Sequence, residues 1–220
     1  MPENHEKKSY EELLNASKKM KKKILLVLGG IVALLLVLFL LVEGIGLLTT
    51  LLQEEPEGEY YFYPTYEGNI MENPEYLDLD RSVVYAENAS GYGVSTSITE
   101  ENREEFDEYV LFLYDYLQTI IAGDEEAYNA CFTYDYLNEY GEQKSFSPQM
   151  LYDMRIALYG KEGSDADLRV TYQLDYCFYQ NDGTFRRDVG SGASRPVYVV
   201  LVKDAAGNIR IDLLVVRYET

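Results

Sequence analysis

The distribution of apolar residues separates one long uncharged run from a domain with two different periodicities. From Ile24 to Val42, 19 successive residues carry no charge. As a helix this run extends about 28 Å, close to the roughly 30 Å thickness of the hydrocarbon core of a bilayer. The pattern therefore predicts a transmembrane helix, and the apolar stretch after Glu43 extends this anchor region to residue 52.

Helical spacing dominates the segment that follows residue 101. Asn102 and Glu105 have the spacing of a capping box, and apolar side chains then recur every three or four residues as far as Gly123. Ser147 followed by Pro148 has the form of an N-cap with proline in the first turn. Three helices are therefore predicted, over residues 102–123, 124–141 and 147–159.

The period changes to two after residue 167 and stays at two to the end of the chain. Apolar residues from Leu168 to Phe178 alternate with polar ones, which is typical of a strand with one buried face. Turn residues at 181–183, 190–194 and 204–208 separate this strand from three more. The predicted strands are 168–178, 184–189, 196–203 and 209–218. The expected fold class is α+β: an N-terminal transmembrane helix, then three helices packed on a curved antiparallel sheet of about four strands.

Residues 53–101 are rich in Glu, Gly, Pro, Asn and Tyr and predict an acidic, Tyr-rich stalk. Two stretches within it, Ser82–Ala86 and Tyr92–Ile98, are candidate strands that pair with each other or with the domain edge. The aromatic cluster from Tyr60 to Tyr66 has two interpretations. It is a contact surface for a wall polymer or a partner, or it packs onto the membrane interface or the domain, and we favour packing.

Charge sets the expected topology. Residues 1–23 hold 7 Lys and 4 Glu, whereas residues 24–220 hold 12 basic and 34 acidic residues. Basic residues beside a span stay in the cytoplasm. We expect a cytoplasmic tail (1–23), a signal-anchor helix in the plasma membrane (24–52), a stalk (53–101) and an extracellular domain (102–220). A cleavable signal peptide is the alternative, but its apolar core would be shorter. The acidic outer part disfavours nucleic acid as a partner.

Three helices followed by an antiparallel meander, together with the phrase AGDEEAYNACFT at residues 122–133, resemble the nuclear transport factor 2-like (cystatin-like) fold. The resemblance covers Phe106 to Tyr218. It implies that the helices close a cone formed by the sheet. That family often inserts a strand or hairpin between the second and third helices, and the segment 142–146 is short for one.

Candidate chemistry is sparse. The only histidine, His5, lies in the predicted cytoplasmic tail, so the outer domain lacks Ser-His-Asp or Cys-His catalysis and His-containing zinc sites. No cofactor or metal motif is present. The resemblance places Cys131 on a helix and Cys177 on a strand that pack together, which leaves a disulfide and two reduced thiols as alternatives.

Enzymes of the resembled superfamily, such as ketosteroid isomerases and related cyclases, use Asp and Tyr that face into the cone. Asp175 and Asp212 interrupt predicted strands and are the candidate pocket carboxylates. The alternative is that each faces solvent or pairs with a cross-strand arginine such as Arg169 or Arg210.

The leading hypothesis is a non-enzymatic, membrane-tethered domain on a bacterial cell surface that binds a protein or a small ligand. Its architecture is also similar to the inner-membrane assembly subunit of type IV secretion or conjugation machines. A small-molecule isomerase or cyclase that uses Asp and Tyr in the cone is the third hypothesis. The anchor helix makes membrane lipid a partner in each of them.

Overall fold

The computed structural model describes residues 60–89, 94–164 and 167–216. Contacts divide the chain into two units, residues 1–56 and residues 57–220, and all described residues belong to the second. Within these ranges no helix has both the length and the apolar character needed to cross a membrane. The predicted cytoplasmic tail and membrane anchor lie outside the described residues.

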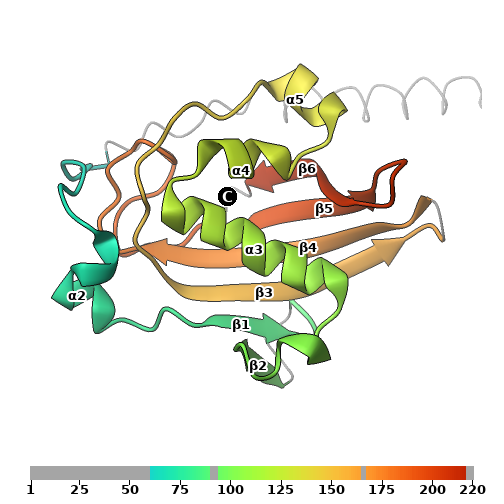
Figure 1. Ribbon diagram of the computed structural model, residues 1–220, viewed down its shortest axis with the longest axis horizontal. Coiled ribbons are helices and arrows are strands. Elements are labelled where there is room, and N and C mark those ends of the chain that lie inside the picture. Colours follow the sequence, from blue (N-terminus) through green and yellow to red (C-terminus); the bar gives the residue numbers. More distant parts are fainter. Residues whose placement is uncertain (1–59, 90–93, 165–166, 217–220) are drawn as a thin grey trace, which may run out of the picture. The chain divides into compact units, whose positions relative to one another are not determined.

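A six-stranded sheet forms the centre of the domain (Figure 1). Its strands lie in the order β2-β1-β3-β4-β5-β6. The neighbours β1 and β3 run parallel, and all other neighbouring pairs are antiparallel. The strands are β1 (Val83–Ala86), β2 (Ser95–Ile98), β3 (Leu151–Glu162), β4 (Arg169–Phe178), β5 (Val197–Lys203) and β6 (Ile209–Val216).

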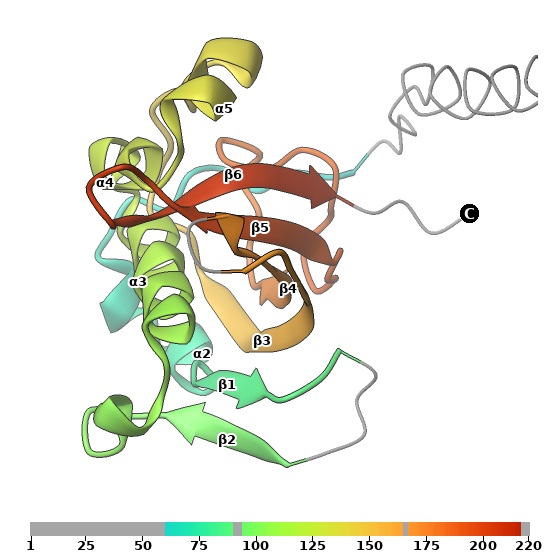
Figure 2. The ribbon, with the colours of Figure 1, turned by 90° about the vertical axis from the view of Figure 1, so that its right-hand side faces the viewer.

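The helix α3 lies across one face of this sheet, and Figure 2 shows α3 and α4 on the same side of it. Its first turn is capped by Asp107, whose carboxylate accepts hydrogen bonds from the amides of Tyr109 and Val110, both at 2.9 Å. It ends at Gly123, which adopts the left-handed conformation at φ 66°. The described helices are η1 (Ile70–Glu72), α2 (Pro74–Leu77), η2 (Arg103–Glu105), α3 (Glu108–Ala122), α4 (Glu125–Ala130) and α5 (Tyr134–Tyr140).

The predicted helix boundaries are partly confirmed. Asn102 precedes a short 3-10 turn without a side-chain cap, so α3 begins at Glu108 rather than after Asn102. Asp124 caps α4 as predicted, and Gly141 ends the helical segment as predicted. Between them the helix is interrupted at Thr133, which is the N-cap of α5. The Thr133 hydroxyl accepts a hydrogen bond from the backbone amide of Tyr136 at 3.2 Å. The single helix expected over 124–141 is therefore two short helices.

The third predicted helix is wrong, because residues 151–162 form the strand β3. Apolar residues at 150, 151, 154, 157 and 158 fit a helical period, but the segment pairs with β1 on one side and β4 on the other. The Ser147 hydroxyl bonds to Asp182 and does not cap a helix. Backbone pairing with two neighbours thus overrides the local helix signal.

The predicted strand at 184–189 is also wrong. Residues 179–196 form a loop, connected to β4 by a single bridge between Cys177 and Ser194. The strands β5 and β6 and the turn at Asp204–Asn208 lie where the alternation predicts them. The mixed α+β class is confirmed, with six strands in place of four and with a parallel pair.

The predicted stalk contains folded structure. The strands β1 and β2 pair with each other as expected, and β1 also pairs with β3 at the centre of the sheet. Ahead of them, Ile70 and Tyr76 are buried and pack with Met150 in a small second core. The boundary predicted at residue 102 is therefore wrong, because the compact unit begins near residue 57.

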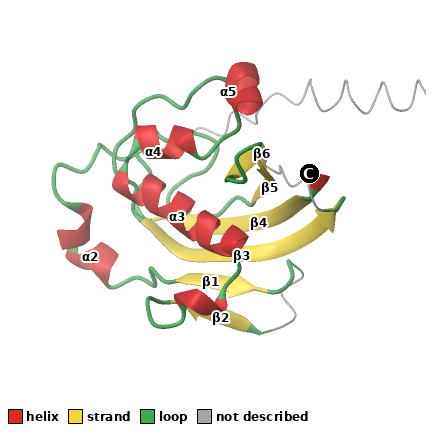
Figure 3. Ribbon diagram, turned by 45° about the vertical axis from the view of Figure 1, so that its right-hand side comes forward, coloured by secondary structure: helices red, strands yellow, loops and turns green. Residues whose placement is uncertain are grey.

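The main core lies between α3 and the sheet, and Figure 3 shows β3 and β4 curving beneath α3. Alternate residues of β4 point into it, and the intervening residues lie on the opposite face. The largest fully buried side chains of this core include Leu113, Tyr116, Leu117, Ile120, Leu151, Met154, Ile156, Tyr172, Leu174, Phe178 and Leu201.

Candidate functional site

The space predicted as a cone is packed with aromatic and aliphatic side chains. The Tyr116 hydroxyl donates to the Tyr128 hydroxyl at 3.3 Å, and both rings contact Phe132. Burial raises the pKa of both tyrosines, so both stay neutral. Among the described residues, no Asp or Glu side chain is fully buried in this core. The described core therefore offers no carboxylate to act as a base beside these hydroxyls.

One hydroxyl of the core lacks a hydrogen-bond partner. Tyr172 is 0% exposed, and its hydroxyl makes no hydrogen bond of ordinary geometry, although the Asp107 carboxylate is close enough to interact with it. Burial, followed by the nearby Asp107 carboxylate, raises the pKa of Tyr172. That carboxylate is exposed and already caps α3. Tyr172 is thus a buried phenol, and Asp107 is the N-terminal cap of α3.

The predicted strand carboxylates both pair with arginines on other strands. Asp175 lies on the face of β4 that points away from the core, 3.5 Å from Nη1 of Arg155. Burial raises the pKa of Asp175, and Gln173 and Arg155 oppose this effect. Asp212 accepts from Nη2 of Arg169 at 2.6 Å. The structure does not bring these two carboxylates together with the buried tyrosines.

The two cysteines are free thiols. Cys131 packs against the main core, and its sulfur donates to the carbonyl of Ala127 at 3.3 Å. Cys177 lies on the outer face of β4, opposite Tyr152 of β3. The sheet separates the two side chains, so the disulfide alternative is not formed.

A pocket of about 130 Å³ lies between the segment around α2, the first residues of β1, the end of β2 and α3. None of the sequence-predicted site residues lines it. One part of its wall is apolar and is made by Met71, Val83, Ile98 and Ile121. The other part carries polar atoms and is made by Tyr76, Arg81, Ser82, Tyr114 and Gln118.

Of the residues that the structure describes, Arg81 is the only charged one that lines this pocket. Its Nε atom is buried and has no hydrogen-bond partner. Its guanidinium lies 5.6 Å from the centroid of the Tyr76 ring, a cation–π distance. Among the described residues, no carboxylate oxygen comes within the 4.0 Å of an ion pair with it. The pocket thus presents a cation whose hydrogen-bonding capacity is not used by the described residues.

The neighbours of Arg81 explain why its guanidinium forms no ion pair with a described residue. Asp80 is adjacent in sequence, but its carboxylate accepts from the hydroxyl and the amide of Ser82. These hydrogen bonds lower the pKa of Asp80, which keeps it ionised and directed at Ser82. The Tyr76 hydroxyl donates to the carbonyl of Leu151 at 2.8 Å. Burial raises the pKa of Tyr76 to about 12, although the charge of Arg81 lowers it, so Tyr76 remains a neutral wall.

Chemically, this arrangement suits binding of an anion. A guanidinium with an unused N–H attracts a negatively charged oxygen, and the apolar wall holds a hydrophobic group beside it. In the part of the chain that the structure describes, no group of three or more His, Cys, Asp and Glu side chains is placed to hold a metal ion. Sequence reasoning missed this site, although Arg81 has one signal: it is the first basic residue after Lys23.

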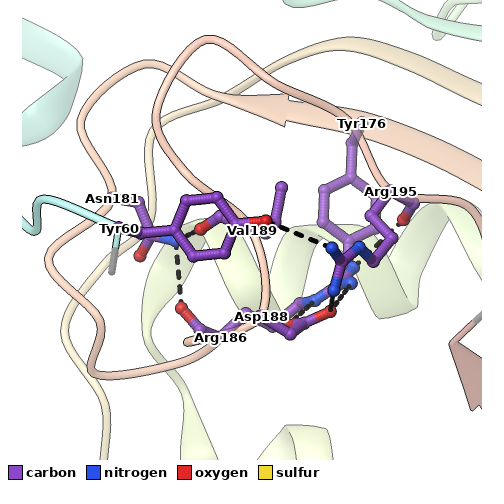
Figure 4. A network of polar contacts seen from close by, with 7 residues as sticks. All are labelled: Tyr60, Tyr176, Asn181, Arg186, Asp188, Val189 and Arg195. Atoms are coloured by element: carbon purple, nitrogen blue, oxygen red, sulfur yellow. Dashed lines mark hydrogen bonds and ion pairs between the residues drawn. The ribbon is translucent and has the colours of Figure 1, made fainter. Parts of the chain in front are cut away.

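A second polar cluster fixes the loop that follows β4, and Figure 4 shows it at close range. Arg186 donates to Asp188 through Nε at 2.9 Å and Nη2 at 2.6 Å. Arg195 donates from Nη2 to the Tyr60 hydroxyl at 3.1 Å. Asn181, which is 0% exposed, donates to the carbonyls of Arg186 and Val189. These buried groups are satisfied by one another, which is typical of a structural network.

The same loop holds the segment 60–66. Besides the bond between Tyr60 and Arg195, Tyr63 N donates to the carbonyl of Asn181 at 2.9 Å. The Thr65 hydroxyl donates to Asp182 at 3.0 Å. Phe62 lies under the guanidinium of Arg187 at 5.1 Å. The predicted packing of this aromatic segment onto the domain is thus confirmed for Tyr60 and Phe62, while Tyr61 is 73% exposed.

Comparisons with known proteins add no relative from which a role for either cluster could be transferred. No protein-family model matches the chain, and no curated protein and no solved structure matches it.

Proposed function

We propose that this protein is a membrane-tethered, non-enzymatic binding domain whose binding site is the pocket beside Arg81. The uncharged run from Ile24 to Val42 supports the tether, because its length fits a bilayer. The five lysines between residues 18 and 23 support a cytoplasmic N-terminus. The domain then lies on the outer side of the plasma membrane. Its resemblance to the nuclear transport factor 2-like fold is part of the same proposal.

The observation that carries the binding role is the unused capacity of Arg81. Leaving a buried hydrogen-bonding group of an arginine unmet is unfavourable, so proteins usually satisfy such groups. Here Arg81, whose Nε is unmet, lines a pocket with four apolar residues in its wall. A ligand with a hydrogen-bond acceptor and an apolar group would bind Arg81 and pack against the apolar residues at the same time.

A fragment screen tests the binding role. The full chain in nonionic detergent is mixed with small fragments, and ligand-observed saturation-transfer NMR identifies those that bind. Gln118 is exposed on α3 and lines the pocket, so Gln118→Trp places a large ring at the pocket. We expect fragment signals that disappear in Gln118→Trp and persist in Glu126→Trp, a matched change at an exposed position of α4. If no fragment signal depends on Gln118, the proposed site is wrong.

The topology has its own test. Alkaline phosphatase fused after Thr220 is active only outside the cytoplasm, where its disulfides form. We expect an active fusion in bacterial cells, and loss of activity when Lys18, Lys19, Lys21, Lys22 and Lys23 are replaced by Glu. An inactive fusion with the native sequence would contradict the proposed orientation.

A further inference from the structure

The pocket beside Arg81 carries a positive charge in a domain that is otherwise strongly negative. Residues 57–220 contain 12 basic and 31 acidic residues, a net charge of −19. Within the described ranges, Arg81 is the only basic residue that lines the pocket, and no acidic residue lines it. The pocket is therefore a local exception to the field of the domain, which favours cations elsewhere.

The charge of the ligand follows from this count. One guanidinium balances one negative charge, and its planar fork matches the two oxygens of a carboxylate. A phosphate dianion would meet a single cation while the surrounding domain repels its second charge. A neutral ligand would leave the unused N–H of Arg81 without the charge-assisted bond that it favours. These considerations select a monoanionic carboxylate.

The remainder of the ligand follows from the wall and the size. Met71, Val83, Ile98 and Ile121 form the apolar part of the wall. The pocket measures about 130 Å³. An engineered apolar cavity of about 150 Å³ holds one benzene molecule, so the present pocket fits a group of similar size. A chain of roughly four or five carbons beside the carboxylate fills this space.

Resting on the proposed function of the pocket, we infer that its ligand is a carboxylate attached to a short apolar group, with the carboxylate on Arg81 and the apolar group against Ile98 and Ile121. Two sources carry this chemistry. One is a free short-chain carboxylic acid, and the other is the C-terminal residue of a peptide chain whose side chain is apolar.

Four probes test this inference on the full chain in nonionic detergent, with affinities measured by titration calorimetry. Isovalerate carries the proposed groups, isovaleramide is its neutral isostere, inorganic phosphate is a dianion, and N-acetyl-leucine represents a peptide C-terminus. A charge-assisted hydrogen bond predicts roughly tenfold or greater preference for isovalerate over isovaleramide. We expect phosphate to bind more weakly than isovalerate. The acid and amide comparison uses the native chain and does not depend on the folding of any variant.

Variants then locate the carboxylate. Arg81→Met should weaken isovalerate binding roughly tenfold or more and leave isovaleramide unchanged. Arg81→Lys keeps the charge without the fork and should have an intermediate effect. The matched control is Arg169→Met, an exposed arginine outside the pocket, which should leave both affinities unchanged. Thermal unfolding followed by circular dichroism establishes that each variant is folded.

The outcomes separate this inference from the proposed function. Equal affinity for isovalerate and isovaleramide, or isovalerate binding that does not depend on Arg81, would overturn the carboxylate inference while fragment binding at the pocket stands. Absence of any ligand dependent on Gln118 would overturn both. Tighter binding of N-acetyl-leucine than of isovalerate supports a peptide C-terminus as the source, and weaker binding supports a free acid.

Discussion

Arg186→Met tests how strongly a buried charge pair holds the loop after β4. The side chain of Arg186 is 9% exposed and that of Asp188 is 12% exposed, with 2.6 Å between Nη2 and Oδ2. Without the guanidinium, the Asp188 carboxylate stays buried with Nη1 of Arg195 at 3.5 Å. Removing one partner of a buried pair costs about 3–5 kcal/mol of unfolding free energy.

The assay is thermal unfolding of the full chain in nonionic detergent, followed by far-ultraviolet circular dichroism. For a domain of this size the expected loss corresponds to a fall in melting temperature of roughly 6–20 °C. Arg169→Met is the matched control, because the distance from Arg169 to Asp212 is also 2.6 Å but the side chains are 45% and 26% exposed. A pair exposed to this degree contributes about 0–1 kcal/mol.

The pH dependence gives a second readout. Burial acts to raise the pKa of Asp188, but the hydrogen bonds and charge of Arg186 outweigh it, so the pKa lies below the ordinary 3.8. Its stabilising contribution is therefore present above that value and is lost as the pH falls through the folded pKa. In Arg186→Met burial prevails and the carboxyl pKa rises. The penalty of the variant should then shrink as the pH falls and the carboxyl group is protonated.

Two results would refute this reasoning. Equal losses of stability in Arg186→Met and Arg169→Met would show that burial does not set the strength of the pair. A penalty in Arg186→Met that stays constant from neutral pH to below pH 4 would show that the Asp188 charge is not its cause.

Three further predictions concern the core, a helix cap and the thiols. Tyr172→Phe should stabilise the domain by about 1–2 kcal/mol in urea unfolding, because it removes an unpartnered buried hydroxyl, whereas Tyr76→Phe should destabilise it by about 1 kcal/mol. Destabilisation by Tyr172→Phe would contradict this. Asp107→Ala should cost about 1 kcal/mol in the same assay through loss of the α3 cap, and no loss would show that the cap is dispensable. Because both cysteines are free thiols, dithiothreitol should leave the melting temperature unchanged, and a melting temperature that depends on the reductant would indicate a disulfide. Iodoacetamide should alkylate the folded protein slowly, since burial raises the pKa of Cys131 to about 11 and also raises the pKa of Cys177.

The sequence predicted the features that depend on neighbouring residues. Asp124 caps a helix and Gly123 ends the one before it, because these roles need only the local backbone and one side chain. The alternation from residue 168 to 178 identified β4, since successive side chains of a strand point to opposite faces. The turn at 204–208 follows from its own Asp, Gly and Asn residues.

Tertiary contacts decided the rest. Residues 151–162 carry a pattern that suits a helix or a strand, and pairing with β1 and β4 selects the strand. The composition of residues 53–101 predicted a stalk, but two short strands within it, Val83–Ala86 and Ser95–Ile98, gain stability by joining a sheet formed with distant residues. The pocket beside Arg81 combines α2, β1, β2 and α3, so no local pattern could indicate it. Periodicity and capping depend on adjacent residues, whereas burial and strand pairing depend on the whole fold.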